Sequence, residues 1–183
     1  MGSARLEIGH TALLIVDVQE KLLSQMHNRD LILDQVCRLL DAALVLDVPV
    51  LVTEQYPRGL GPTVSAVAKR LAGRLTACEK LKFSACVEPI RQALVEHMVN
   101  SVLICGIESH VCVLQTCLEL QSKGYLPFLV ADAISSRREL DHQTAVHRMT
   151  QAGVIPTTVE SAILELVQEA GSDRFKAVLP LIK

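Results

Sequence analysis

The sequence predicts a three-layer α/β/α domain, Rossmann-like in layout, with helices on both faces of a six-stranded and mainly parallel sheet. Short aliphatic segments alternate with segments whose apolar residues recur every three or four positions, as in parallel strands joined by crossover helices. The length of 183 residues suits a single domain over 1–183, and its core is aliphatic because half of the residues are apolar and only 3% are aromatic. We expect the strand order 3-2-1-4-5-6, with a switch point between the first and fourth strands.

In the first half of the chain, the run ALLIV from residue 12 is uniformly apolar, as expected of a strand buried on both faces of a parallel sheet. The long helix after it has a leucine-rich stripe, and a later helix carries Pro89 in its first turn, where proline is tolerated. Prolines and glycines at 57–62 mark a loop. The elements expected here are strands at 12–16, 48–53 and 75–78 and helices at 22–46, 64–71 and 87–97.

The second half centres on an apolar strand that stops at Gly106. The helix that follows ends at Lys123 and Gly124, a cationic last turn followed by a glycine stop. A strand closed by Asp132 comes next, and the remaining segments alternate in the same way. The elements expected here are strands at 102–105, 126–131 and 154–158 and helices at 113–125, 139–152, 159–169 and 173–183.

The six cysteines form no CxxC pair, and Cys37, Cys105 and Cys117 lie in apolar strand or helix patterns. This distribution is typical of reduced, buried thiols and not of a disulfide framework, so we expect a cytoplasmic protein. The six histidines have no spacing relative to the cysteines that would predict a metal site. We therefore expect neither a metal nor another cofactor.

The net charge is −2 and the basic residues are scattered, which gives no electrostatic basis for binding nucleic acid or an anionic membrane. No apolar run is long enough to span a bilayer. We therefore expect neither nucleic acid nor a membrane as a partner, and the site residues described next point to a small-molecule substrate.

Three chemically useful side chains follow strands: Asp17 after the first, Lys80 after the third and Cys112 after the fourth. In the predicted topology these strand ends open into one crevice. A thiol in the first turn of a helix is close to the positive end of the helix dipole and to free backbone N–H groups, which favour a thiolate and can hold an oxyanion. A carboxylate can take the proton of that thiol, and an ammonium stabilises both charges.

Each of the three residues also has an ordinary structural explanation. A cysteine in a first helical turn is more often packed than reactive, Asp17 can cap a turn, and Lys80 can be a surface lysine like Lys82. Their joint placement at strand ends favours a site.

The runs LLIVDVQ, EKLKFSA and CGIESHVCVLQT resemble the three signature segments of the isochorismatase-like cysteine hydrolases. The stretches TEQYPRGLGPT, DAISSR and FKAVLPLIK further resemble the eukaryotic branch known as isochorismatase domain-containing proteins. The resemblance covers nearly the whole chain and includes order, spacing and position in the sheet. It implies a catalytic triad, which falls by motif match on Asp17, Lys80 and Cys112.

The resemblance also implies a cis peptide bond between Ile107 and Glu108 that aims backbone N–H groups, together with that of Cys112, at an oxyanion. Nicotinamidases of the family carry a metal-binding Asp-x-His after the second strand, whereas this chain has Glu54-Gln55-Tyr56, so a zinc-dependent nicotinamidase is not expected. The isochorismate hydrolases of the same family cleave a vinyl ether, and some of these relatives lack the cysteine that this chain has as Cys112. Its presence favours an amide, carbamoyl or similar acyl substrate.

The sequence thus predicts a metal-independent, amidase-type cysteine hydrolase that forms a thioester on Cys112. Gln19, Tyr56 and Phe83 are candidate substrate-binding residues, and each can equally be a packing residue. The family often forms dimers or larger assemblies, so we expect a homo-oligomer. The alternatives are a non-catalytic oligomeric interaction protein that retains the hydrolase fold, and a redox-sensing thiol resolved by Cys105 or Cys117.

Overall fold

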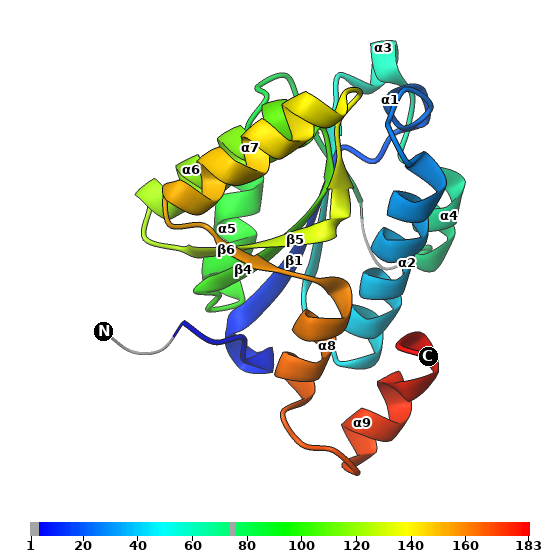
Figure 1. Ribbon diagram of the computed structural model, residues 1–183, viewed down its shortest axis with the longest axis vertical. Helices are drawn as coiled ribbons and strands as arrows, with labels where there is room; N and C mark the ends of the chain where they lie inside the picture. Colours follow the sequence, from blue (N-terminus) through cyan, green and yellow to red (C-terminus); the bar gives the residue numbers. More distant parts are fainter. Residues whose placement is uncertain (1–3, 74–75) are drawn as a thin grey trace.

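Six parallel strands form one sheet in the order β3-β2-β1-β4-β5-β6, which confirms the predicted order. A computed structural model of the chain describes residues 4–73 and 76–183. Figure 1 shows the sheet between two layers of helices. The strands are β1 (Thr11–Val16), β2 (Val50–Gln55), β3 (Cys78–Lys80), β4 (Ser101–Ile107), β5 (Leu126–Ser135) and β6 (Ile155–Thr157).

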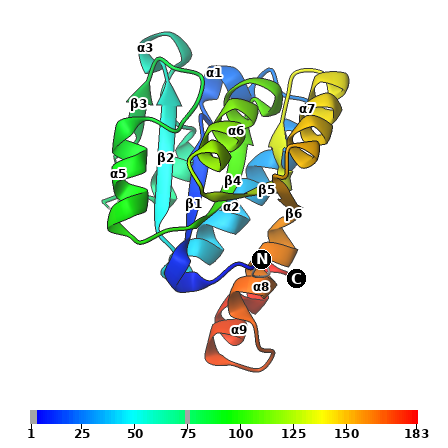
Figure 2. The ribbon, with the colours of Figure 1, turned by 90° about the vertical axis from the view of Figure 1, so that its left-hand side faces the viewer.

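The helices lie on both faces of this sheet. Figure 2 shows α5, α6 and α7 together on one side, with α2 behind the strands; α8 packs in the same core cluster as α2. The helices are α1 (Glu20–Leu23), α2 (Arg29–Val45), α3 (Pro57–Leu60), α4 (Ser65–Arg70), α5 (Glu88–Glu96), α6 (Leu114–Ser122), α7 (Glu139–Gln151), α8 (Val159–Val167) and α9 (Asp173–Val178), with short turns η1 (Ile8–His10), η2 (Ser109–Val113) and η3 (Leu179–Leu181). None of the helices in the described residues is long and apolar enough to cross a membrane.

The core is divided by the sheet into two aliphatic clusters. Alternate residues of β1 point to opposite faces, so that Leu13 and Ile15 join the cluster under α2 and α8, whereas Leu14 and Val16 join the cluster under α5, α6 and α7. Every residue of β1 and β4 is buried. The two central strands are therefore covered on both faces, and their carboxyl ends form the switch point of the sheet.

The helix predicted over 22–46 is wrong in one respect, because the chain forms two helices, α1 and α2, with a break between them. Asn28 at the break has a left-handed backbone (φ 56°). The His27 N–H donates to the carbonyl of Ser136, and the Ser135 hydroxyl donates to the carbonyl of His27. These hydrogen bonds hold the break against the end of β5. A tertiary contact therefore overrides the local helical pattern.

The fifth strand is longer than predicted, since it does not close at Asp132 but continues to Ser135. The pairing with β4 shifts between Ile104 and Gly106, where β5 accommodates extra residues. Within this irregular stretch, the Asp132 carboxylate accepts a hydrogen bond from the Val159 N–H at the start of α8. An acidic residue that seemed to end the strand instead caps a neighbouring helix.

Further boundaries also differ from the prediction, since β4 does not stop at Gly106 but continues to Ile107. The expected third strand at 75–78 is observed as Cys78–Lys80, so Lys80 is the last residue of the strand and not a residue after it; Leu75 lies outside the described residues. The loop expected at 57–62 contains the single-turn helix α3.

Gly106 allows β4 to pass close to β1. Its φ of +116° is in the region that favours glycine, and a Cβ atom there would lie 2.1 Å from the carbonyl oxygen of Val16. Because Asp17 follows Val16 and Cys112 follows β4, this close approach sets the spacing of the strand ends that carry them.

We predict that Gly106→Ala lowers the free energy of unfolding by about 3 kcal/mol or more, because the new methyl group meets backbone that cannot move independently. Gly9→Ala is the matched control, since a Cβ there has nothing within 4 Å and the residue needs no positive φ. Denaturant unfolding of both variants measures the difference. Equal stability of the two would contradict the tight β1–β4 contact.

Candidate active site

The carboxyl ends of β1, β3 and β4 bring the three predicted site residues together. The ammonium of Lys80 lies 2.6 Å from the Asp17 carboxylate, and both side chains are almost completely buried, at 1% and 0% exposed. A hydrogen bond also joins the Asp17 carboxylate to the Cys112 thiol. Asp17 therefore touches both of the other residues and lies at the centre of the group.

The Lys80 ammonium is surrounded by oxygen atoms. Besides Asp17, it lies 2.8 Å from Oε1 of Gln55, 2.9 Å from the carbonyl of Phe83 and 3.2 Å from the carbonyl of Lys82. An ammonium has only three protons, so these four acceptors occupy all of them. Lys80 therefore acts on Asp17 and on the fold of residues 82–83, with no donor left for a bound molecule.

Asp17 is held at both carboxylate oxygens and by its backbone. The Thr53 hydroxyl donates to Oδ1 at 2.8 Å, Lys80 donates to Oδ2, and the Asp17 N–H donates to the carbonyl of Thr53. The backbone is left-handed (φ 53°), a conformation that aspartate tolerates better than most residues. Burial raises the pKa of Asp17 above its ordinary value, while the charge and hydrogen bonds of Lys80, Thr53 and Cys112 act in the opposite direction.

Cys112 differs from the prediction in its local structure and in its charge. It lies in the π-helical turn η2 that precedes α6, not in the first turn of an α-helix. Burial raises the pKa of its thiol to about 12, and the nearby charge of Asp17 contributes to the rise; the charge of Lys80 and a backbone hydrogen bond from Glu108 lower it. At neutral pH the resting Cys112 is therefore a protonated thiol whose proton faces Asp17.

The turn between β4 and Cys112 contains a cis peptide bond between Ile107 and Glu108, at the position that the family resemblance implies. The carbonyl of Glu108 accepts hydrogen bonds from the N–H groups of Val111 and Val113, both at 3.1 Å. The second of these, five residues along the chain, creates the π-helical turn. The backbone N–H group of Glu108, in the same turn, donates to the sulfur of Cys112.

The three candidate substrate-binding residues have different surroundings. Gln19 is buried, its amide group donates to the carbonyls of Gln55 and Gly61, and its carbonyl accepts from the Gln55 N–H, so it braces the loop after β2. Tyr56 and Phe83 are about half exposed, at 51% and 53%. Only these two have surface available to a ligand.

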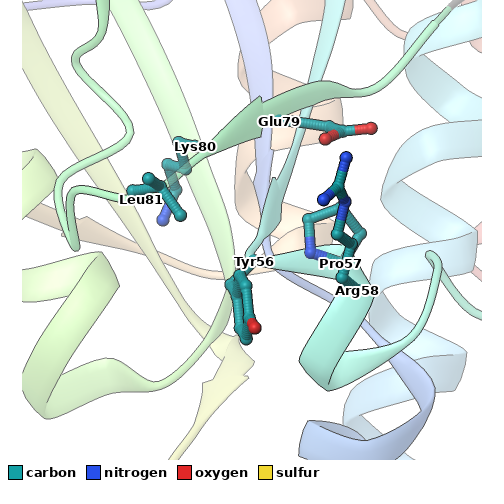
Figure 3. A pocket seen from close by; sticks show the side chains of 6 residues that line it. All are labelled: Tyr56, Pro57, Arg58, Glu79, Lys80 and Leu81. Carbon is teal, nitrogen blue, oxygen red and sulfur yellow. The ribbon is translucent and has the colours of Figure 1, made fainter.

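A pocket of about 390 Å³ opens beside Lys80 at the ends of β2 and β3. It is lined by Tyr56, Pro57, Arg58, Glu79, Lys80 and Leu81. In Figure 3 the side chains of Arg58 and Glu79 point toward one another across it, and Tyr56 lies at its edge. The pocket therefore offers both apolar and charged walls next to the Asp17–Lys80 pair.

Sequence reasoning missed Thr53 and Gln55, which hold Asp17 and Lys80. Both lie in β2, two positions apart, so their side chains share one face of the strand. Two polar residues on one face near the end of an otherwise apolar strand are a signal that points to this edge of the sheet.

Cys105 and Cys117, the thiols considered as partners in a redox switch, are poorly placed to form a disulfide with Cys112. Cys105 and Cys117 are fully buried, and burial raises the pKa of each thiol. Cys105 also belongs to the core on the opposite face of the sheet from Cys112. Within residues 4–73 and 76–183, no three His, Cys, Asp or Glu side chains form a group that could hold a metal ion.

Asp17, Lys80 and Cys112 thus meet at the switch point of a parallel α/β sheet. The isochorismatase domain model matches residues 11–161. The chain belongs to the isochorismatase family.

Relatives match over almost the whole chain. A secreted isochorismatase effector, Isc1, of Phytophthora sojae is 42% identical over 96% of this chain and 86% of its own length. The isochorismatase domain-containing protein 2B of Mus musculus is 38% identical over 100% of this chain and 88% of its own length.

Two solved structures show the same fold. The MAR1 ribonuclease of Caenorhabditis elegans superposes with a TM-score of 0.94 at 42% identity, covering 98% of this chain and 92% of that one. The YcaC gene product of Escherichia coli, described as an octameric hydrolase of unknown specificity, superposes with a TM-score of 0.89 at 25% identity, covering 99% and 90%.

We predict that Lys80→Met lowers the free energy of unfolding by about 3–5 kcal/mol, because it leaves the Asp17 carboxylate buried without its cation. Adding Asp17→Asn to this variant recovers much of the loss, since the buried charge is then removed as well. Lys82→Met is the control, because the Lys82 side chain is exposed and its replacement should change the free energy of unfolding by less than about 0.5 kcal/mol. Equilibrium unfolding at pH 7 tests this, and equal stability of the two lysine variants would contradict it.

We predict that alkylation of Cys112 by iodoacetamide rises about tenfold per pH unit from pH 7 to 10 without a plateau, because the thiolate fraction of a thiol with a pKa near 12 does so. Asp17→Asn removes a negative charge and so lowers the thiol pKa, which speeds alkylation at pH 8 by about tenfold. Asp47→Asn, at an exposed site, leaves the rate unchanged. Peptide mass spectrometry gives the rates, and a plateau below pH 9 would contradict the buried, neutral thiol.

Proposed function

We propose that the protein is a metal-independent cysteine hydrolase that cleaves a small amide, carbamoyl or related acyl compound through Asp17, Lys80 and Cys112. The observation that carries the proposal is the position of Asp17, with its carboxylate 2.6 Å from the Lys80 ammonium and hydrogen-bonded to the Cys112 thiol. A carboxylate in contact with both a thiol and a fixed cation can accept a proton and return it without a histidine.

In the proposed reaction, the sulfur of Cys112 attacks the carbonyl carbon of the substrate while its proton moves to Asp17. Backbone N–H groups of the turn from Ile107 and Glu108 to Cys112 bind the oxyanion. The amine leaves with the proton from Asp17, and a thioester remains on Cys112. A water molecule then gives a proton to Asp17 and attacks the thioester, and the sulfur leaves with that proton.

The ionisation of the resting site supports a proton transfer that accompanies bond formation. The pKa of the Cys112 thiol, about 12, keeps it protonated before the substrate binds. Burial raises the pKa of Asp17, which makes its carboxylate a stronger base than an exposed one. Lys80 keeps that carboxylate charged and in place. The thiolate therefore arises only as the carbon–sulfur bond forms, which protects the idle enzyme from oxidation.

The pocket next to Lys80 is the proposed site for the part of the substrate that does not react. Tyr56 and Leu81 offer exposed apolar surface there, and Phe83 follows closely in the chain. Exposed side chains of this size at one opening are typical of a binding surface, and Tyr56 is one of the few aromatic residues in a chain with only 3% of them. We assign Tyr56 and Phe83 to substrate binding and Gln19 to the support of the loop.

The alternative of a non-catalytic interaction protein has less support. Burying Asp17 and Lys80 costs desolvation energy that an apolar pair of similar size would avoid. A protein that used only its surface would gain nothing from this arrangement beside a thiol.

Assembly and compartment are also proposals. An octamer is described for the Escherichia coli neighbour, which supports a homo-oligomer here. We propose the cytoplasm as the compartment because of the free cysteines. The Phytophthora sojae relative is named as secreted, so fractionation of cells that express the full chain is the direct test.

The proposed activity is tested by a panel of small primary amides, N-carbamoyl compounds and acyl esters, with an RNA oligonucleotide included because one neighbour is a ribonuclease. We expect turnover of at least one amide or carbamoyl compound and a loss of at least about 10³-fold in kcat for Cys112→Ser and for Asp17→Asn. In Asp17→Asn, turnover should be lost while Cys112 is alkylated faster. This combination is expected only if Asp17 is the catalytic base and its charge also raises the pKa of the Cys112 thiol.

Asp47→Asn and Cys78→Ser serve as controls that retain activity. Turnover that survives Cys112→Ser, or cleavage of the RNA alone, would reject the cysteine-hydrolase proposal. Absence of turnover on the whole panel, with a Cys112 that alkylates identically in wild type and Asp17→Asn, would favour the interaction protein.

A further inference from the structure

Three groups of Glu108 make hydrogen bonds: its carbonyl, its backbone N–H and its carboxylate. Its carbonyl accepts from the N–H groups of Val111 and Val113, its backbone donates to the sulfur of Cys112, and its carboxylate accepts from Arg137 at 2.7 Å. The first two contacts lie within one turn of the chain. The third reaches a different element of the fold, so it is the contact that anchors the turn from outside.

The ion pair between Glu108 and Arg137 is asymmetric in its exposure. The Glu108 side chain is only 11% exposed, whereas that of Arg137 is 59% exposed. The carboxylate has therefore given up most of its hydration and depends on the guanidinium as its counter-charge. A charge-assisted bond to a buried partner is stronger than one between two exposed side chains.

Arg137 projects from a segment that is itself fixed. Ser135 pairs in register with Ile107, the residue before Glu108, and the Ser136 hydroxyl lies 2.9 Å from Nδ1 of His110 in the same turn. The break between α1 and α2 is hydrogen-bonded to both serines. The backbone that carries Arg137 is thus fixed to the sheet, beside the turn that contains Glu108.

The neighbouring Arg138 provides a matched comparison. Its side chain is exposed and makes no hydrogen bond or ion pair within residues 4–73 and 76–183. The two arginines have the same charge and adjacent positions. Only one of them reaches Glu108.

We propose that Arg137 is a positioning residue that acts through Glu108, holding the turn from Ile107 to Cys112 so that its backbone N–H groups face the sulfur and the oxyanion. The proposal rests on the proposed function of this site. Arg137 itself touches neither the sulfur nor the proposed base.

Loss of Arg137 has two consequences for the site. The Glu108 carboxylate loses its counter-charge and moves toward water, which pulls the backbone of the turn away from Cys112. The hydrogen bond from the Glu108 backbone, which lowers the pKa of the thiol, weakens with it. The same N–H groups are then less well placed for the transition state, so kcat falls more than KM changes.

A double-mutant cycle tests the proposal, with the variants Arg137→Gln, Glu108→Gln and the two combined. We expect Arg137→Gln to slow alkylation of Cys112 at pH 9 about three- to tenfold, and to have little further effect once Glu108 is neutral. Arg137→Lys should restore part of the rate, because a point charge can still pair with Glu108. Arg138→Gln should match wild type.

Hydrogen exchange of the peptide that covers 105–113 provides a second measurement, which does not need a reactive thiol. Faster exchange in Arg137→Gln than in Arg138→Gln supports the proposal, and equal exchange overturns it. Additive effects in the cycle also overturn it, since they would mean that Arg137 acts without Glu108.

The outcomes separate this inference from the proposed function. If Cys112 responds to Asp17→Asn as predicted but not to Arg137→Gln, the hydrolase stands and the role of Arg137 is rejected. If Cys112 is inert in every variant and hydrogen exchange still responds to Arg137 alone, the positioning contact stands and the hydrolase mechanism is rejected.

Discussion

The buried contact between Lys80 and Asp17 is the interaction on which the rest of the site depends. It joins the ends of β3 and β1 across β2, and each partner is held by further hydrogen bonds, from Thr53 to the carboxylate and from the ammonium to Gln55. Neither charge would be tolerated alone at this depth. Because the pair exists only when the strand ends are in register, the fold of the sheet and the chemistry of the site are one structural requirement.

The surroundings of the Cys112 thiol follow from the same buried pair. Cys112 shares an apolar environment that would make most cysteines unreactive, and its pKa is raised accordingly. What distinguishes it from Cys117, which is buried in the same core, is the carboxylate to which its proton is hydrogen-bonded. In the proposed mechanism, the site therefore combines a buried thiol nucleophile with an adjacent carboxylate base, and the thiol reacts only when a substrate is bound.

The strand order and the convergence of Asp17, Lys80 and Cys112 could be predicted because they depend on local patterns: apolar runs, helical spacing and the rule that parallel strands end on one edge. The π-helical turn at Cys112 could not, since it arises from a hydrogen bond five residues along the chain whose geometry leaves no trace in spacing. The break before α2 and the neutral state of the thiol were missed for a related reason. Both are caused by groups distant in sequence, the serines at the end of β5 and the burial around Asp17.

The most direct test of the account is to look for the thioester. A turnover mixture of wild-type protein with a cleaved amide is quenched in acid, and peptides are mapped by mass spectrometry. The account predicts an acyl group, replacing one hydrogen, on the peptide that contains Cys112. Steady turnover with Cys112 unmodified under these conditions, or with the acyl group on another residue, would contradict it.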